Sequence, residues 1–175
     1  MTSEQWFLPK KIQYSQNPYY FRFLSDLVNF AILSGARKSE ILGLKKNDVV
    51  IGDLGGFILF RDTKNGENRK VLLTKELTEF LKQVIGKNPF SEYGFCHKNG
   101  QPIKSIDGAF RNACGSAGIK GLWFHDLRHT FCTRMANEGV NIFVVMQIVG
   151  HKDTATAKQY INPTDEHVNG SNVKD

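Results

Sequence analysis

The feature that most limits what this chain can fold into is a change of hydrophobic period between Asp48 and Thr74. Apolar residues alternate there over three short stretches, which is typical of β-strands. These stretches are 49–51, 57–60 and 71–73. Glycines separate the first two, and Asn65-Gly66 before the third is a strong hairpin signal. The sequence therefore predicts a small three-stranded antiparallel sheet in the first half of the chain.

The segments on both sides of these strands have helical periodicity instead. Residues 19–34 place their apolar side chains on one face, and Gly35 is the expected stop. Ser39 is the expected N-cap of a second helix, and Thr74 the N-cap of a third that ends at Gly86. Further helices are expected at 105–117, from 125 through 128, and at 154–160. The predicted fold class is α+β, mainly α-helical.

Length and charge restrict the kind of protein and its partners. A chain of 175 residues suits one domain with a real core. The 23 basic and 17 acidic side chains give a net charge of +6, which favours a polyanionic partner, although many basic proteins bind none. The three cysteines have no paired spacing and indicate reduced thiols of a cytosolic protein. No apolar run is long enough to span a membrane.

Polar residues suited to phosphate chemistry gather toward the end of the sequence. His125 and Arg128 stand in HDLRH, His151 follows a glycine, and Tyr160 comes nine residues later. An arginine offers a planar fork of donors to two phosphate oxygens, and histidines exchange protons near neutral pH. A deprotonated tyrosine is a nucleophile. This set, with no evident cluster of metal ligands, suits attack on a phosphodiester by tyrosine.

The stretches HDLRHTFCTRMANEGV, IVGH and TAKQY resemble the C-terminal half of the catalytic domain of the tyrosine recombinase, or phage integrase, family. That family carries H-x-x-R, then G-H or G-W, then a tyrosine nine residues on. The resemblance covers about residues 19–162. It implies the tyrosine recombinase catalytic-domain fold and a site-specific recombinase that cleaves and rejoins DNA through a 3′-phosphotyrosyl link. It also implies that the reaction needs no metal, ATP or other cofactor.

Two further site residues are implied by the same resemblance. Arg37 stands in G-A-R-x-S-E, the context in which the family presents its first catalytic arginine. Lys64 stands beside the predicted hairpin tip in TKNGENRKVLL, where the family places a catalytic lysine. Taken alone, either residue is more often a solvated surface cation. Lys70 is the nearest competitor to Lys64, but it lies within the predicted strand.

The resemblance implies a role for each member of the site. Tyr160 is the expected nucleophile, with His125 as its base and Lys64 as the acid that protonates the leaving oxygen. The two arginines bind the non-bridging oxygens, and the histidine of the G-H pair orients the phosphate. The expected catalytic residues are Arg37, Lys64, His125, Arg128, His151 and Tyr160.

Three other interpretations of these residues compete with this one. Residues 136–148, with Gly139 at a turn, resemble the helix-turn-helix of a non-catalytic DNA-binding module. That module would explain the positive charge but not the site residues. A type IB topoisomerase shares the chemistry and stays a close alternative. A zinc site at His125 and His129 lacks the glutamate of H-E-x-x-H and an evident third ligand.

The expected organisation is an arm or linker at 1–17, the catalytic domain at 18–163 and a polar tail at 164–175. The family's usual N-terminal core-binding domain is absent from these residues, so a fragment or an unusual short member is expected. The expected partners are double-stranded DNA and other recombinase subunits in a synaptic complex. We expect the isolated domain to be monomeric, without membrane contact, and the protein to be cytoplasmic and nucleoid-associated on DNA.

Overall fold

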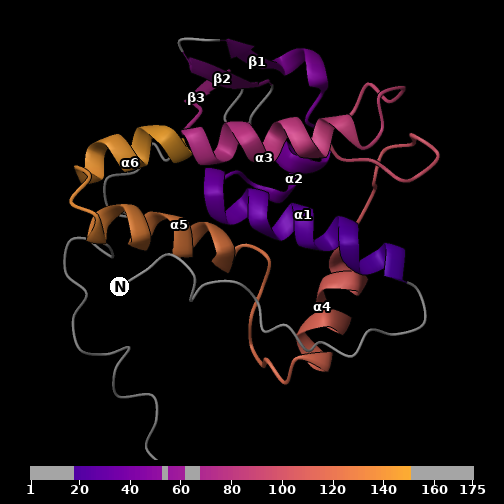
Figure 1. The fold of residues 1–175 in the computed structure, drawn as a ribbon. Helices are drawn as coiled ribbons and strands as arrows, with labels where there is room; N and C mark the ends of the chain where they lie inside the picture. The colour runs from indigo at the N-terminus through magenta and orange to yellow at the C-terminus, as the bar shows by residue number, and fades with distance from the viewer. Residues whose placement is uncertain (1–17, 53–54, 62–67, 151–175) are drawn as a thin grey trace, which may run out of the picture.

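The computed structural model describes residues 18–52, 55–61 and 68–150 (Figure 1). As the sequence predicts, three consecutive strands lie between helical segments of the chain. In order they are α1 (Pro18–Ser34), α2 (Lys38–Leu42), the 3-10 helix η2 (Lys46–Asp48), β1 (Val49–Gly52), β2 (Gly55–Phe60), β3 (Arg69–Leu72), α3 (Lys75–Gly86), α4 (Asp107–Ser116), α5 (Asp126–Asn137) and α6 (Ile142–Val149).

The three strands form one antiparallel sheet in the order β1-β2-β3, which confirms the prediction from their alternation. Ile58 pairs with Val71, and Phe60 pairs with Arg69. All four of these side chains are buried, whereas Leu72 on the other face of β3 is exposed. An arginine therefore occupies an inward position that alternation would assign to an apolar residue.

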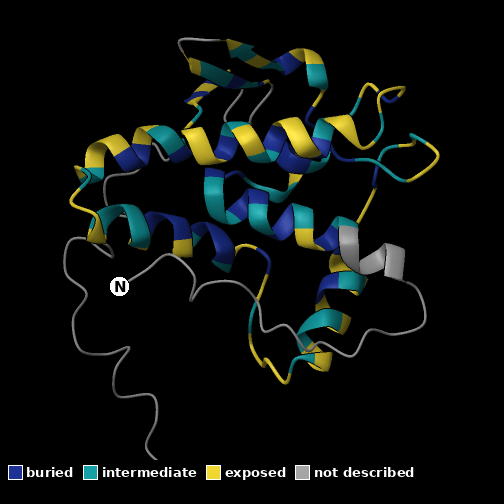
Figure 2. Ribbon diagram, in the orientation of Figure 1, coloured by how far each residue is buried: buried dark blue, intermediate teal, exposed yellow. Residues whose placement is uncertain are grey.

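Helix α1 is the centre of the core. Its Leu27, Phe30 and Ala31 side chains have almost no exposed surface. The helix packs against α2, α3, α4 and α5, and Figure 1 shows it between α3 above and α5 below. It ends at Ser34, where Gly35 has a φ of +62°, as predicted from the sequence. The buried residues of α1 and its neighbours form the dark blue interior in Figure 2.

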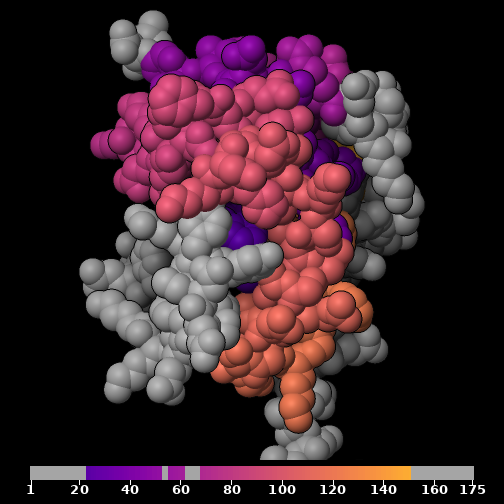
Figure 3. Space-filling view, turned by 90° about the vertical axis from the view of Figure 1, so that its right-hand side faces the viewer, coloured from indigo at the N-terminus to yellow at the C-terminus, as the bar shows by residue number. Residues whose placement is uncertain are grey.

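The helices after the sheet pack around α1. The backbone N–H of Leu77 donates to Thr74 Oγ1 at 3.1 Å, so the predicted N-cap of α3 is confirmed. The buried Phe110 of α4 packs in the same core, edge-to-face on Phe124. In Figure 3 the chain from α3 through α4 makes up most of the described surface on this side.

Helices α5 and α6 form a second, smaller apolar cluster from Phe131, Cys132, Val145 and Val149. The chain turns between the helices at Gly139, which has a φ of +80°. The turn confirms the helix pair that the sequence predicts. In the described ranges no helix is both long and apolar enough to cross a membrane.

Candidate active site

The segment between α1 and α2 places Arg37 at the site. Ser34 Oγ donates to the carbonyl of Phe30 at 2.6 Å and accepts from the N–H of Ala36 at 3.2 Å, which fixes the turn. A Cβ on Gly35 would lie 2.5 Å from Phe131 Cδ1, so only glycine fits between the two helices. The Ser34 hydrogen bonds and the close contact of Gly35 with Phe131 therefore fix the backbone that leads to Arg37.

Arg37 is the N-cap of α2, so the prediction of Ser39 as the cap is wrong. Glu40 is the N3 residue of the helix and makes the reciprocal bond of a capping box, because its Oε2 accepts from the backbone N–H of Arg37 at 2.8 Å. Glu40 Oε1 accepts from Arg37 Nη1 at 2.9 Å. Arg37 Nη2 donates to the carbonyl of Gly150 at 2.8 Å. The Arg37 side chain is 16% exposed, so part of it still faces solvent.

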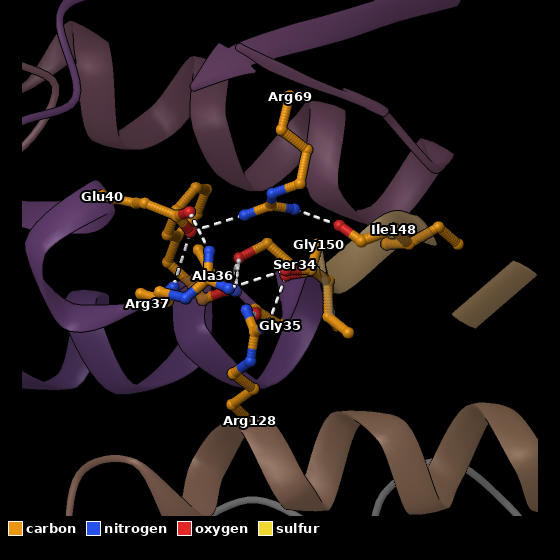
Figure 4. Close-up of polar contacts among 11 residues, drawn as sticks. Ser34, Gly35, Ala36, Arg37, Glu40, Arg69, Arg128, Ile148 and Gly150 are labelled. Carbon is orange, nitrogen blue, oxygen red and sulfur yellow. Dashed lines mark hydrogen bonds and ion pairs between the residues drawn. The ribbon is translucent and has the colours of Figure 1, made fainter. Parts of the chain in front are cut away.

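Arg128 enters from α5 on the opposite side (Figure 4). Its side chain is 2% exposed; Nη1 donates to the carbonyl of Gly35 at 2.7 Å, and Nη2 to that of Val149. Burial, and then the positive charges of Arg37 and Arg69, lower the pKa of Arg128 to about 10. The guanidinium therefore stays charged at neutral pH, although it is buried.

Arg69, the first residue of β3, completes the group and was not singled out from the sequence. Arg69 Nη2 donates to Glu40 Oε2 at 2.5 Å, and Nη1 donates to the carbonyl of Ile148. Burial lowers the pKa of Arg69, and the negative charge of Glu40 opposes that shift. We call Arg37, Glu40, Arg69 and Arg128 the arginine cluster. Arg37 and Arg69 pair with the Glu40 carboxylate, and Arg128 binds backbone carbonyls instead, so the cluster holds three positive charges against one negative charge.

The arginine cluster is built on the C-terminal end of α6. The carbonyls of Ile148, Val149 and Gly150 each accept a hydrogen bond from a different arginine of the cluster. Carbonyls at a helix C-terminus lack partners within the helix and carry partial negative charge, so they attract cations. Gly150 ends α6 with a φ of +68°. The residue that follows it in the sequence is His151.

His125 lies at the N-cap position of α5, one turn before Arg128. Its ring is exposed and meets the ring of His129 edge-on, with centroids 5.2 Å apart. Partial burial, then the positive charges of His129 and Arg128, lower the pKa of His125, whereas Asp126 opposes the shift. The imidazole is therefore mostly neutral at pH 7 and able to accept a proton.

Of the six predicted site residues, the structure brings Arg37 and Arg128 together at the end of α6 and places His125 on the same helix as Arg128. Lys64, His151 and Tyr160 lie outside the described residues, as does the predicted helix at 154–160. The competitor Lys70 places Nζ 3.9 Å from the ring centroid of Phe57. That contact is on the face of β3 opposite to Arg69, away from the arginine cluster.

Sequence reasoning missed two members of the cluster, Glu40 and Arg69. Glu40 follows the expected cap Ser39 in the sequence, and a single acidic residue near a helix start does not indicate a buried ion pair. A signal for Arg69 exists in the alternation of residues 69–72, because the arginine shares the inward face with Val71. A charged residue at an inward strand position indicates a buried partner. That partner, Glu40, cannot be identified from the strand itself.

The chain is similar in sequence to proteins of one family. A family model described as the phage integrase family matches residues 9–167. The chain is 30% identical to the integrase of Escherichia phage 186 over 148 residues, covering 83% of this chain and 39% of that protein. It is 29% identical to tyrosine recombinase XerC of Lactobacillus leichmannii over 146 residues, covering 77% of this chain and 48% of that one. The chain thus spans less than half the length of these two relatives.

A solved structure has the same fold. The XerH site-specific recombinase bound to its difH substrate in a pre-cleavage complex superposes with a TM-score of 0.67 at 22% identity, covering 90% of this chain and 48% of that one. The helical architecture with a three-stranded antiparallel sheet is therefore that of a tyrosine recombinase catalytic domain, and the predicted fold class is confirmed. With the family model matching most of its residues, this chain belongs to the phage integrase family.

Proposed function

We propose that this chain is the catalytic domain of a site-specific DNA recombinase, spanning residues 18–163, that cleaves and rejoins DNA strands. The observation that carries the proposal is the convergence of Arg37 and Arg128 on the end of α6, directly before His151. The two arginines come from different elements, the start of α2 and the first turn of α5, and positive charge exceeds negative charge where they meet. Such a preorganised cationic site suits the charge that develops on a phosphate during its transfer.

In the proposed reaction Tyr160 Oη forms a bond to the phosphorus while the bond from phosphorus to the 5′ oxygen breaks. His125 accepts the phenolic proton, and Lys64 gives a proton to the leaving 5′ oxygen. Arg37 and Arg128 stabilise the charge on the non-bridging oxygens, and His151 donates a hydrogen bond to one of them. The reverse steps rejoin the strand, because the phosphotyrosyl link keeps the energy of the phosphodiester.

The electrostatics of His125 support its role as the base. An unperturbed tyrosine has a pKa of about 10, so its proton needs an acceptor at neutral pH. The lowered pKa of His125 keeps its ring unprotonated under those conditions. The histidine is exposed at the start of α5, where a side chain from outside the described residues can approach it.

The proposed partners are double-stranded DNA and further recombinase subunits. The net charge of +6 favours DNA, and phosphate contacts of this kind position a protein but carry little sequence information. The XerH structure is one of a recombinase bound to its DNA substrate, which supports DNA as the partner here. We place the reaction on DNA in the cytoplasm, in a synapse of several subunits.

The proposal is tested by trapping a covalent protein–DNA adduct. Duplexes with a randomised central segment and a nick beside it are incubated with the protein, and DNA that stays attached in SDS is recovered and sequenced. The nick lets the cleaved piece diffuse away, so the adduct accumulates. We expect an adduct that forms in EDTA, disappears in Tyr160→Phe and persists in Tyr93→Phe, a matched change of a tyrosine outside the proposed site.

Other outcomes of the same experiment would contradict the proposal. An adduct that persists in Tyr160→Phe would place the nucleophile elsewhere. Binding without any adduct in the wild type would favour a non-catalytic helix-turn-helix module, since α5, the turn at Gly139 and α6 form a helix pair of that kind. Cleavage lost in EDTA and restored by magnesium would replace the tyrosine mechanism with a metal-dependent one.

A further inference from the structure

The least expected feature of the cluster is Arg69, a buried cation at an inward position of the sheet. Its side chain is 8% exposed and is surrounded by Phe60, Glu40 and the end of α6. Arg69 Nε is buried and finds no hydrogen-bond acceptor among the described residues. Burying a paired charge rarely adds stability over a well-packed apolar side chain. Stability alone therefore does not explain an arginine here.

We propose that Arg69 is a positioning residue, which sets the placement and effective charge of Arg37 through Glu40 and fixes the end of α6. This inference rests on the proposed function, because it assigns Arg69 a part in the cleavage reaction at that site. Arg69 does not touch DNA in this proposal. It acts through the two groups that it binds, the Glu40 carboxylate and the Ile148 carbonyl.

The first part of the argument is competition for one carboxylate. Glu40 Oε2 accepts from both Arg69 Nη2 and the backbone N–H of Arg37, which leaves Oε1 for Arg37 Nη1. Without Arg69, the Glu40 carboxylate can pair with the Arg37 guanidinium through both oxygens, the geometry that carboxylates and guanidiniums prefer. Arg37 would then be more nearly neutralised and turned toward Glu40. Arg69 thus keeps the positive charge of Arg37 available for a phosphate.

The second part is the connection between two segments of the site. Arg69 begins β3, the strand that follows the predicted hairpin of Lys64, and its Nη1 binds the last turn of α6, which precedes His151. The fit is close, because a Cβ on Gly150 would lie 2.8 Å from Arg69 Cδ. A shift of either segment therefore moves the other. Small errors in the placement of reacting groups are expensive, since about 1 Å can reduce a rate by about 10²-fold.

The test uses single-turnover cleavage of the duplex recovered as the covalent adduct, with the 175-residue protein in excess. Arg69→Met keeps an apolar stem and removes the charge, and Arg69→Lys keeps the charge but cannot bind Glu40 and Ile148 together. We expect Arg69→Met to slow cleavage by about 10–10²-fold, in line with small misplacements of catalytic groups, and Arg69→Lys to recover part of that loss. DNA affinity should change by less than about twofold, because the side chain is buried.

Arg61→Met is the matched control. Arg61 lies just after β2 and forms an ion pair with Asp48 at 2.6 Å; its side chain is 57% exposed, and its partner is not a member of the cluster. Arg61→Met removes one positive charge beside the sheet, as Arg69→Met does within it. We expect it to leave the cleavage rate unchanged. A cleavage rate for Arg69→Met equal to that of Arg61→Met would overturn the inference.

A double-mutant cycle separates positioning from a merely structural role. In the Arg37→Lys background, Arg69→Met should slow cleavage much less than in the wild type, since both changes affect the same guanidinium. Multiplicative effects would show that Arg69 does not act through Arg37 and would overturn the proposal. Circular dichroism identifies which variants fold, and only the cleavage rates of folded variants are used to test the positioning role. Loss of the fold in both Arg69 variants would assign the residue a structural role only and also overturn it.

Failure of the proposed function has a different signature. A wild-type protein that forms no adduct contradicts the recombinase activity, and with it the positioning role. A wild type that cleaves, together with an Arg69→Met that cleaves equally fast, contradicts the positioning role alone.

Discussion

Two groups of ion pairs in this molecule have similar distances but opposite surroundings. In the arginine cluster, Arg69 and Glu40 are 2.5 Å apart, with side chains 8% and 4% exposed. On the outer face of α3, Lys82 and Glu79 are 2.9 Å apart, with side chains 52% and 59% exposed. Water screens the second pair and is excluded from the first. The distance between the charges therefore says little about what either pair contributes.

Because the two groups differ in burial, removing one partner should affect stability differently in each. A surface pair that loses one partner is rehydrated, so its loss is small. The members of the cluster are connected by hydrogen bonds. Glu40 accepts from two arginines, and the arginines also donate to carbonyls at the end of α6. Removing one member leaves buried polar groups without partners. The predictions below test this contrast, from the largest expected effect to the smallest.

The largest effect is expected from Glu40→Ala. Arg37 and Arg69 would lose their carboxylate, and we expect the free energy of unfolding to fall by about 3–5 kcal/mol, the usual loss when a buried charge loses its partner. Urea denaturation followed by circular dichroism measures it. Glu40→Gln is the control, because it keeps an acceptor oxygen and the shape of the side chain, and it should be less damaging. A loss below about 1 kcal/mol for Glu40→Ala would make the cluster equivalent to a surface pair.

The next effect concerns the backbone that the cluster uses. Gly35, whose carbonyl accepts from Arg128, has a φ of +62° and no room for a Cβ beside Phe131. Gly35→Ala should lower the free energy of unfolding by about 2–4 kcal/mol, from left-handed strain and overpacking together. Gly118→Ala is matched in conformation, with a φ of +70° and no heavy atom near the added Cβ. It should lose only about 1 kcal/mol, and equal losses at both positions would rule out the close approach.

The local features of the fold could be predicted from the sequence. Gly35 as a helix stop, Thr74 as a cap and the three strands depend on residues close together in the chain, and all three were predicted correctly. The Ser39 cap was wrong because α2 begins at Lys38, with Arg37 at the N-cap and Glu40 binding the N–H of Arg37. Local preference alone does not decide between a serine and a glutamate that are neighbours.

The candidate site also has a part that local sequence predicts and a part that it does not. Arg37, His125 and Arg128 were predicted from motifs, but the bonds that hold the cluster join residues 29, 79 and 113 positions apart. No periodicity connects Glu40 with Arg69 or Arg69 with Ile148. These contacts exist only because β3, α2 and α6 meet around one point in the fold. Sequence patterns therefore indicate which residues are unusual, whereas the fold determines their partners.

A smaller effect is expected at His125, an exposed ring at the edge of the cluster. The pKa of His125 should be below that of an unperturbed histidine, as measured from the pH dependence of its ring-proton NMR signals. Asp126→Asn should lower the pKa further, because it removes the opposing negative charge, and His129→Gln should raise it. A pKa at or above about 6.5 in the wild type would contradict the lowering expected from partial burial and from the neighbouring positive charges.

The same shift has a defined effect on stability. The unfolded chain binds a proton at His125 more readily than the folded chain does, so folding is disfavoured when the residue is protonated in both states. The contribution of His125 to stability should therefore rise with pH between the lowered folded pKa and about 6.5, and be constant above that range. The cleavage rate should fall as pH drops through the folded pKa, because protonated His125 cannot act as a base.

The smallest effect is expected from the surface pair on α3. Glu79 and Lys82 are three positions apart on the helix, and both side chains are more than half exposed. A double-mutant cycle with Glu79→Gln and Lys82→Gln should give a coupling energy of about 0.2–0.5 kcal/mol, and molar salt should remove it, since the Debye length there is about 3 Å. The same salt should change the loss caused by Glu40→Ala very little, because ions do not reach the buried carboxylate. If salt weakened both to the same extent, water would have to enter the arginine cluster, and the contrast between the two groups of ion pairs would fail.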